Sequence, residues 1–221
     1  MSDDSFIREV NEELRQDQVK ALWRRYGAVV IGVVVAVVVA TAAYVGYDYW
    51  TQRRANQSGD AFSQALELAQ QGENDEALSA LEKLENDGYG SYPVLARMRA
   101  ATVQATSGNP DAAIAGFDAV AADGSAPGVI RDIARLRAGL LLIDHGSYED
   151  VARRVESLTA DGNPLRFTAR EVLGLSAWKQ GNLKEAQALF EEILDDPQTP
   201  QGVRQRAELM SELIAGSGAS S

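Results

Sequence analysis

Residues 181–186, GNLKEA, decide how most of this chain is expected to fold, because they are one of four similar segments. Residues 72–77 (GENDEA), 108–113 (GNPDAA) and 146–151 (GSYEDV) align with them without gaps. Each segment begins with glycine and reaches a small or β-branched residue five positions later, and the glycines are 36, 38 and 35 residues apart. An internal repeat of this length is typical of a stack of similar supersecondary units.

The agreement extends outward from the glycines. Small residues stand seven positions before them, and large apolar residues stand nine and twelve positions after them: Ala65, Ala101, Gly139 and Gly174 before, Leu81, Phe117, Val155 and Phe190 at nine, and Leu84, Val120, Leu158 and Ile193 at twelve. This pattern predicts a helix that ends at each glycine and a second helix that packs back on it. The pattern resembles the tetratricopeptide repeat of about 34 residues, and Leu173-Gly174, Gly181, Ala186 and Phe190 fit that repeat best.

The resemblance implies an all-α fold, a tetratricopeptide-like α-solenoid of about four helical pairs within residues 51–215. Residues 199–214 are expected to form a final capping helix, and residues 216–221 a disordered tail. Four polar residues stand where they could cap the second helices: Asn74, Asn109, Ser147 and Asn182.

A single transmembrane helix is expected at residues 26–50, before the repeats. Residues 27–47, GAVVIGVVVAVVVATAAYVGY, carry no charged side chain and would make about 31 Å of helix, enough to cross a bilayer. Tryptophans and tyrosines flank the run on both sides, as is typical of the two headgroup layers. A buried core segment of a soluble domain is the alternative, but such helices seldom lack a polar face. The run is longer than the apolar core of a signal peptide and starts later, so no cleavage is expected.

The charges beside this run predict its orientation. Arg15, Lys20, Arg24 and Arg25 precede it, whereas only Arg53 and Arg54 soon follow. Because positive flanks stay on the cytoplasmic side, residues 1–25 are expected in the cytoplasm. Residues 51–215 would then be periplasmic, in a protein of the bacterial inner membrane.

One face of the apolar run carries small residues every four positions, Ala28, Gly32, Ala36 and Ala40. Such residues let two membrane helices approach closely, so this face is a candidate helix-pairing surface. The alternative is that alanine and glycine are simply common in such spans.

Composition argues against several function classes. After Trp50 the chain has 16 Lys and Arg against 25 Asp and Glu, so nucleic acid is not an expected partner of the repeats. The chain has no cysteine and one histidine, His145, which stands at an expected helix end, where it suits the helix dipole better than catalysis. No catalytic constellation, phosphate loop or metal cluster is found. We therefore expect no enzyme activity, no cofactor and no small-molecule substrate, and interpret the chain as a protein-binding module.

The partner groove is expected on the concave face, which the first helix of each pair lines in tetratricopeptide stacks. Placing the units in register gives ten apolar candidates: Phe62, Leu66, Leu95, Met98, Ile133, Leu136, Leu140, Ile143, Leu175 and Trp178. This groove lacks the basic clusters that would hold a terminal carboxylate, and suits an apolar helix or an extended hydrophobic segment. The alternatives are that a tightly wound stack buries these residues as core, or that the final helix fills the groove.

The order of parts resembles the YfgM-type ancillary subunits of the SecYEG translocon. The segments 22–27 (LWRRYG), 47–50 (YDYW) and 89–96 (YGSYPVLA) carry the resemblance most specifically. It implies a role beside the translocon, with a membrane-anchored periplasmic folding factor of the PpiD type, in helping secreted chains. A scaffold for another envelope complex, without client binding, is the alternative.

Overall fold

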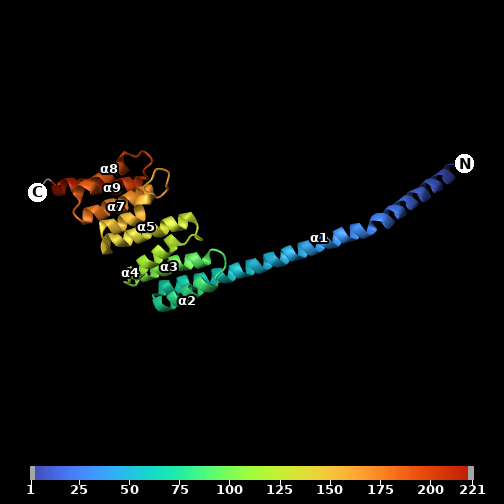
Figure 1. The fold of residues 1–221 in the computed structure, drawn as a ribbon, viewed down its shortest axis with the longest axis horizontal. Coiled ribbons are helices and arrows are strands. Elements are labelled where there is room, and N and C mark those ends of the chain that lie inside the picture. The colour runs from blue at the N-terminus through green and yellow to red at the C-terminus, as the bar shows by residue number, and fades with distance from the viewer. Residues whose placement is uncertain (1–2, 219–221) are drawn as a thin grey trace. The chain divides into compact units, whose positions relative to one another are not determined.

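The computed structural model describes the backbone of residues 3–218 and the side chains of residue 20 and residues 23–217. These described residues form nine α-helices and one short 3-10 helix, and they contain no strand. The chain divides into two compact units, one ending at Arg54 and the other beginning at Ala55. The all-α prediction is therefore confirmed (Figure 1).

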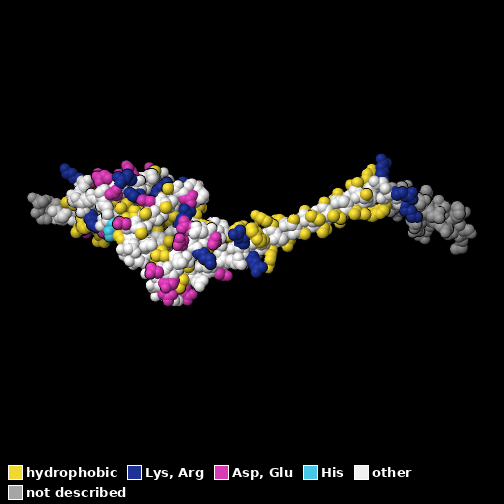
Figure 2. All heavy atoms as spheres, turned by 60° about the horizontal axis from the view of Figure 1, so that its bottom comes forward, with side chains coloured by type: hydrophobic (Ala, Val, Ile, Leu, Met, Phe, Trp, Pro, Cys, Tyr) yellow, Lys and Arg dark blue, Asp and Glu magenta, His cyan; other side chains and the backbone are white. Residues whose placement is uncertain are grey.

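The first unit is formed by the N-terminal part of α1 (Asp3–Gln71). Within the described residues, Trp23–Gln71 is the one helical stretch long and apolar enough to cross a membrane. Its valines at 29–39 are all exposed, as expected of side chains that face lipid. Figure 2 shows this band of hydrophobic side chains with Lys and Arg at both of its ends.

The second unit is a row of antiparallel helical pairs, and α1 supplies its first helix from Ala55 onward. The first two pairs are completed by α2 (Asn74–Asp87), α3 (Tyr92–Thr106) and α4 (Pro110–Ala122). The third consists of α5 (Gly128–His145) and the short α6 (Tyr148–Val155), which continues into a 3-10 helix, Glu156–Leu158. The fourth consists of α7 (Arg166–Lys179) and α8 (Leu183–Asp195), and α9 (Gln201–Gly218) follows as the final helix. This confirms the predicted four pairs and final helix.

The core lies where the repeat pattern places it. Every large residue nine or twelve positions after a repeat glycine is buried, and so are the residues five positions after it: Ala77, Ala113, Val151 and Ala186. Small residues permit the close crossings, because a Cβ added to Gly174 would lie 2.9 Å from Phe190 Cζ and one added to Gly139 would lie 2.5 Å from Val155 Cγ1. The third and fourth pairs thus set a glycine of the first helix against a large residue of the second. In the first two pairs, Ala65 and Ala101 belong to the same hydrophobic clusters as Leu81 and Phe117.

The turns differ in part from the prediction. Gly72, Gly108 and Gly181 have φ values of 83°, 81° and 80°, the left-handed conformation that glycine adopts without strain. Gly146 instead has φ −142° and ψ −173°, so an extended residue ends α5. Here Ser147 accepts a hydrogen bond from the Asp150 N–H, and the Asp150 carboxylate accepts one from the Ser147 N–H, forming a capping box.

Three of the four predicted caps are wrong. The side chains of Asn109 and Asn182 stand at the N-cap positions of α4 and α8 but make no capping hydrogen bond, and Asn74 lies inside α2, one residue after the N-cap. At the other end of the chain, α9 includes residues 216–218, which were assigned to the tail. The rest of that tail, residues 219–221, lies outside the described residues.

Arginine–carboxylate pairs link helices that are distant in sequence. Arg154 of α6 donates from Nη2 to Asp118 Oδ2 of α4 at 2.8 Å, and this hydrogen bond raises the pKa of the guanidinium. Arg206 of α9 donates from Nη2 to Glu171 Oε2 of α7, also at 2.8 Å. Because each pair is partly exposed, it adds little to the free energy of unfolding. Its main effect is to fix the register between neighbouring repeats.

The turn after α4 is organised by Asp123. Its carboxylate accepts hydrogen bonds from the Ser125 hydroxyl at 2.6 Å and the Ser125 N–H at 2.8 Å, and it pairs with Arg97. The Ser125 hydroxyl, followed by Arg97, holds the pKa of Asp123 far below its ordinary value. A depressed carboxyl pKa means that the ionised form favours the folded state.

Candidate protein-binding surface

The first helices of the pairs lie side by side in register. Three contacts join residues that are 35 positions apart: Arg137 Nη1 donates to Thr102 Oγ1 at 2.9 Å, Lys179 Nζ donates to Asp144 Oδ1 at 2.5 Å, and Arg206 pairs with Glu171. The helices α3, α5, α7 and α9 therefore form a continuous row. We call the side of this row that carries these three contacts the inner face.

The structure separates the ten predicted groove residues into three groups. Met98 and Leu136 are buried, with 8% and 9% of their surface exposed, and belong to hydrophobic clusters. Their assignment to an open groove is therefore wrong, because α4 and α6 contribute large apolar side chains to the same clusters. Six others are half-buried: Phe62, Leu66, Leu95, Ile133, Ile143 and Leu175. Leu140 and Trp178 are exposed, at 44% and 38%.

Leu140 and Trp178 are thus the two predicted groove residues that the structure leaves open to solvent. They come from neighbouring helices, α5 and α7, which contact one another. Half-buried Ile143 and Leu175 belong to the same two helices and pack against the core beneath. The open part of the predicted groove is a surface over these two helices, which we call the α5–α7 surface.

A salt bridge borders this surface. Lys179 follows Trp178, Asp144 follows Ile143, and the two charges meet at 2.5 Å. The hydrogen bond from Lys179 lowers the pKa of Asp144. His145, the last residue of α5, is exposed beside this salt bridge, and Figure 2 shows hydrophobic side chains gathered next to the histidine. The surface therefore combines an apolar centre with a charged edge, which suits an amphipathic partner segment.

Sequence reasoning missed the exposed leucines of α9. Leu209 and Leu213 are 65% and 49% exposed, although residues 199–214 were expected to form a polar cap. The contact of Arg206 with Glu171 sets α9 in register with α7, and seven residues further along each helix stand Leu213 and Trp178. The 35-residue spacing was the signal that could have placed Leu213 beside the predicted groove.

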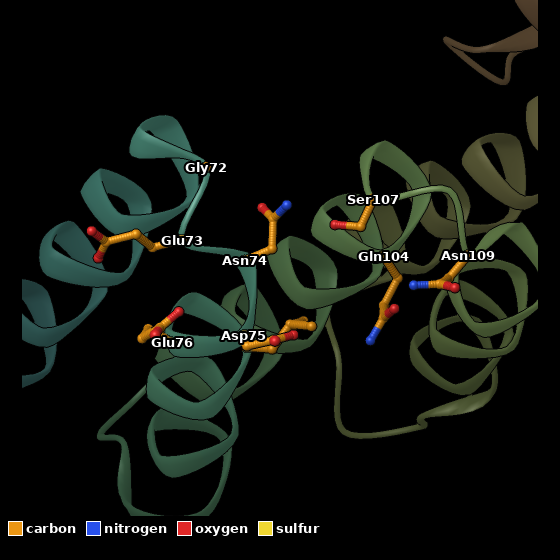
Figure 3. A pocket seen from close by; sticks show the side chains of 9 residues that line it. Gly72, Glu73, Asn74, Asp75, Glu76, Gln104, Ser107 and Asn109 are labelled. Carbon is orange, nitrogen blue, oxygen red and sulfur yellow. The ribbon is translucent and has the colours of Figure 1, made fainter.

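A polar hollow of about 460 Å³ lies at the turns of the first two pairs. Figure 3 shows its lining side chains, among them Glu73, Asp75, Glu76 and Gln104, which come from the start of α2 and the end of α3. Throughout the described residues, no group of three or more potential ligands could hold a metal ion. We assign no ligand to this hollow.

The candidate helix-pairing face lies on α1. Ala28, Gly32, Ala36 and Ala40 are all exposed along it, and a Cβ added to Gly32 would meet no atom within 4 Å. The face is open in this single chain, and pairing with another helix stays a prediction.

Comparison with known families supplies the identity of the fold. Residues 20–211 match the family described as Tetratricopeptide repeat-like domain. The chain belongs to this family. Its repeats form a protein–protein interaction module, joined to one candidate membrane span. No curated protein and no solved structure matched the tetratricopeptide-like chain in the same comparisons.

Proposed function

We propose that this tetratricopeptide-like protein is a membrane-anchored binding module that captures apolar segments of other proteins. The observation that carries the proposal is the pair of exposed side chains Leu140 and Trp178 on neighbouring helices of the inner face. Burying apolar surface stabilises a complex by about 25 cal/mol per Å² before ordering costs are subtracted. An anchored module of this kind would hold its partner close to the membrane.

We further propose the setting in which it acts. The order of parts and the segments 22–27 and 89–96 support an ancillary subunit of the SecYEG translocon that works with a PpiD-type folding factor on secreted or membrane proteins. In this setting the segment before the span is cytoplasmic and the repeats are periplasmic, in the bacterial inner membrane. A scaffold of another envelope complex is the second candidate, favoured by the mixed Lys, Arg, Asp and Glu side chains on the face of the repeats that Figure 2 shows.

Purification of the tagged full-length protein in mild detergent tests the binding role and the setting together. The expected result is co-purification of translocon subunits and the folding factor from wild-type cells. Leu140→Ser combined with Trp178→Ser should remove a periplasmic partner while the melting temperature stays within a few degrees. Val129→Ser is the matched control, because Val129 is exposed on α5 at about 16 Å along the helix from Leu140.

Each outcome has a meaning. If Val129→Ser releases the partner as completely as the double change, the α5–α7 surface is not the binding site. If wild-type protein brings down a complex unrelated to secretion and the double change leaves it intact, the scaffold candidate is favoured.

A reporter that works only in the cytoplasm should be active when fused before Trp23 and silent at the C-terminus. The reverse pattern would contradict both the orientation and the translocon setting.

A further inference from the structure

The helix α9 occupies the position of a first helix in a fifth pair, but no second helix follows it in the described chain. The residues that receive the second helices in the third and fourth pairs are Gly139 and Gly174, which are 35 positions apart. Thirty-five positions further stands Leu209. The contact between Arg206 and Glu171 has the same spacing, so Leu209 lies where a second helix would pack.

This side of α9 is open and has a distinct chemistry. Leu209 and Leu213 are one turn apart and exposed, on the side of the helix opposite to buried Ala207. Glu208 and Glu212 are exposed beside the leucines, and among the described side chains neither carboxylate has an ion-pair partner. We call the surface formed by these two leucines and two glutamates the α9 face.

We propose that the α9 face docks an amphipathic helix of a partner protein, one that carries Lys or Arg along its polar edge and Ala or Gly where it crosses Leu209. The requirement for a small residue follows from the other pairs, in which glycine on the first helix meets Val155 or Phe190 on the second. Leu209 reverses this arrangement, so the incoming helix must supply the small side chain. The basic edge follows from Glu208 and Glu212, which would stand beside it.

Charge also argues against two other occupants. In an antiparallel pair of two α9 helices, Leu209 would meet Leu213 of the second copy, and the four glutamates would lie along the edges of the same contact. Like charges placed in this way oppose association. The two carboxylates would likewise be repelled by an anionic lipid surface. The proposal does not depend on the α5–α7 surface.

Binding of designed peptides to the full-length protein tests the proposal. The protein is placed in phosphatidylcholine nanodiscs, and the probe is a fluorescein-labelled amphipathic helix of 18 residues, the length of α9, with leucines on its apolar face, alanine at the crossing and lysines along the edge. One comparison peptide has glutamate in place of lysine, and another has leucine in place of the alanine. Fluorescence anisotropy gives the dissociation constants.

The lysine and alanine peptide should bind at least about tenfold more tightly than either comparison peptide. Leu209→Ser and the double change Glu208→Lys with Glu212→Lys should each weaken it by about tenfold. The double change Glu76→Lys with Glu82→Lys is the matched control, because it alters the net charge equally at exposed positions of α2. It should leave the dissociation constant within about twofold.

Three results would overturn the proposal. Equal weakening by the α2 control would mean that the peptide responds only to net charge. Equal binding of the alanine and leucine peptides would mean that no small residue is needed opposite Leu209. If Leu209→Ser instead converts a dimer to a monomer in mass photometry, the occupant is a second copy. Circular dichroism of each variant shows whether a loss of binding reflects a loss of fold. The double change Glu208→Gln with Glu212→Gln removes the two charges without reversing them, and its dissociation constant is compared with that of the lysine variant.

Discussion

Replacing Gly139 by alanine tests the close crossing of α5 and α6. The new Cβ would lie 2.5 Å from Val155 Cγ1 and 3.5 Å from Val172 Cγ1. Carbon atoms in contact are about 3.5–4.0 Å apart, so Val155 would have to move by about 1 Å. Both valines are buried, and overpacking of this kind costs about 1–3 kcal/mol. Alanine in a helix recovers about 1 kcal/mol relative to glycine, so the net loss should lie between about 0 and 2 kcal/mol, and nearer the upper value because both valines are fully buried.

Thermal unfolding of the full-length protein, followed by circular dichroism, measures this loss. A change of 1 kcal/mol shifts the melting temperature by about 2–4 °C in a domain of this size. Gly216→Ala is the control, because no atom lies within 4 Å of its added Cβ, and it should leave the melting temperature unchanged or slightly raised. Val155→Ala should partly rescue Gly139→Ala, with a coupling of at least about 0.5 kcal/mol. Strict additivity, or a gain in stability equal to that of the control, would refute the packing argument.

Three further predictions concern the core, the inner face and pH. Ala186→Leu should cost about 1–3 kcal/mol, whereas Lys184→Leu should change stability by no more than about 0.5 kcal/mol; equal melting temperatures would contradict the register. Leu136→Ala should cost about 2–5 kcal/mol and Leu140→Ala about 0.5 kcal/mol or less, and equal losses in denaturant titrations would place Leu140 in the core. Because the pKa of Asp123 is lowered in the fold, the stability lost in Asp123→Asn should be constant above about pH 5 and shrink as the pH falls below about 4; a loss independent of pH down to about 2 would contradict this.

The fold could be predicted because one pattern is repeated four times. The four aligned segments place small and large residues at the same positions, so each segment supports the assignment made for the others. Every predicted large residue is buried. Local polar chemistry was less predictable. An asparagine at a helix start can turn its side chain to the backbone or to water at similar free energy, and among the four expected caps only Ser147 makes its bond.

The binding surface was predicted only in part. Helical periodicity indicates on which face of a helix a residue lies, but not how far the neighbouring helices cover that residue. Met98 and Leu136 were expected on the groove face, but both are buried in hydrophobic clusters that include side chains of α4 and α6. Leu140 stands one turn beyond Leu136 and stays exposed. The depth of a groove depends on how tightly the stack winds, which is set by all pairs together and is not encoded in any single one.

The sequence predicts a membrane helix at residues 26–50 and repeats from residue 51 onward, without showing whether one helix runs through both. In the structure α1 is a single helix from Asp3 to Gln71, and from Ala55 onward it serves as the first helix of the first pair. Ser58 Oγ accepts a hydrogen bond from the Tyr89 N–H at 2.9 Å, and Ala65 is fully buried with Leu81 and Leu84 of the first pair. The first helix of the first pair is therefore the same helix that carries the candidate span. A chain cut before Ala55 keeps the whole of that pair. A chain cut at the turn after Gln71 would instead expose Leu81 and Leu84 of α2 to water and leave α2 as an unpaired helix at the end of the stack.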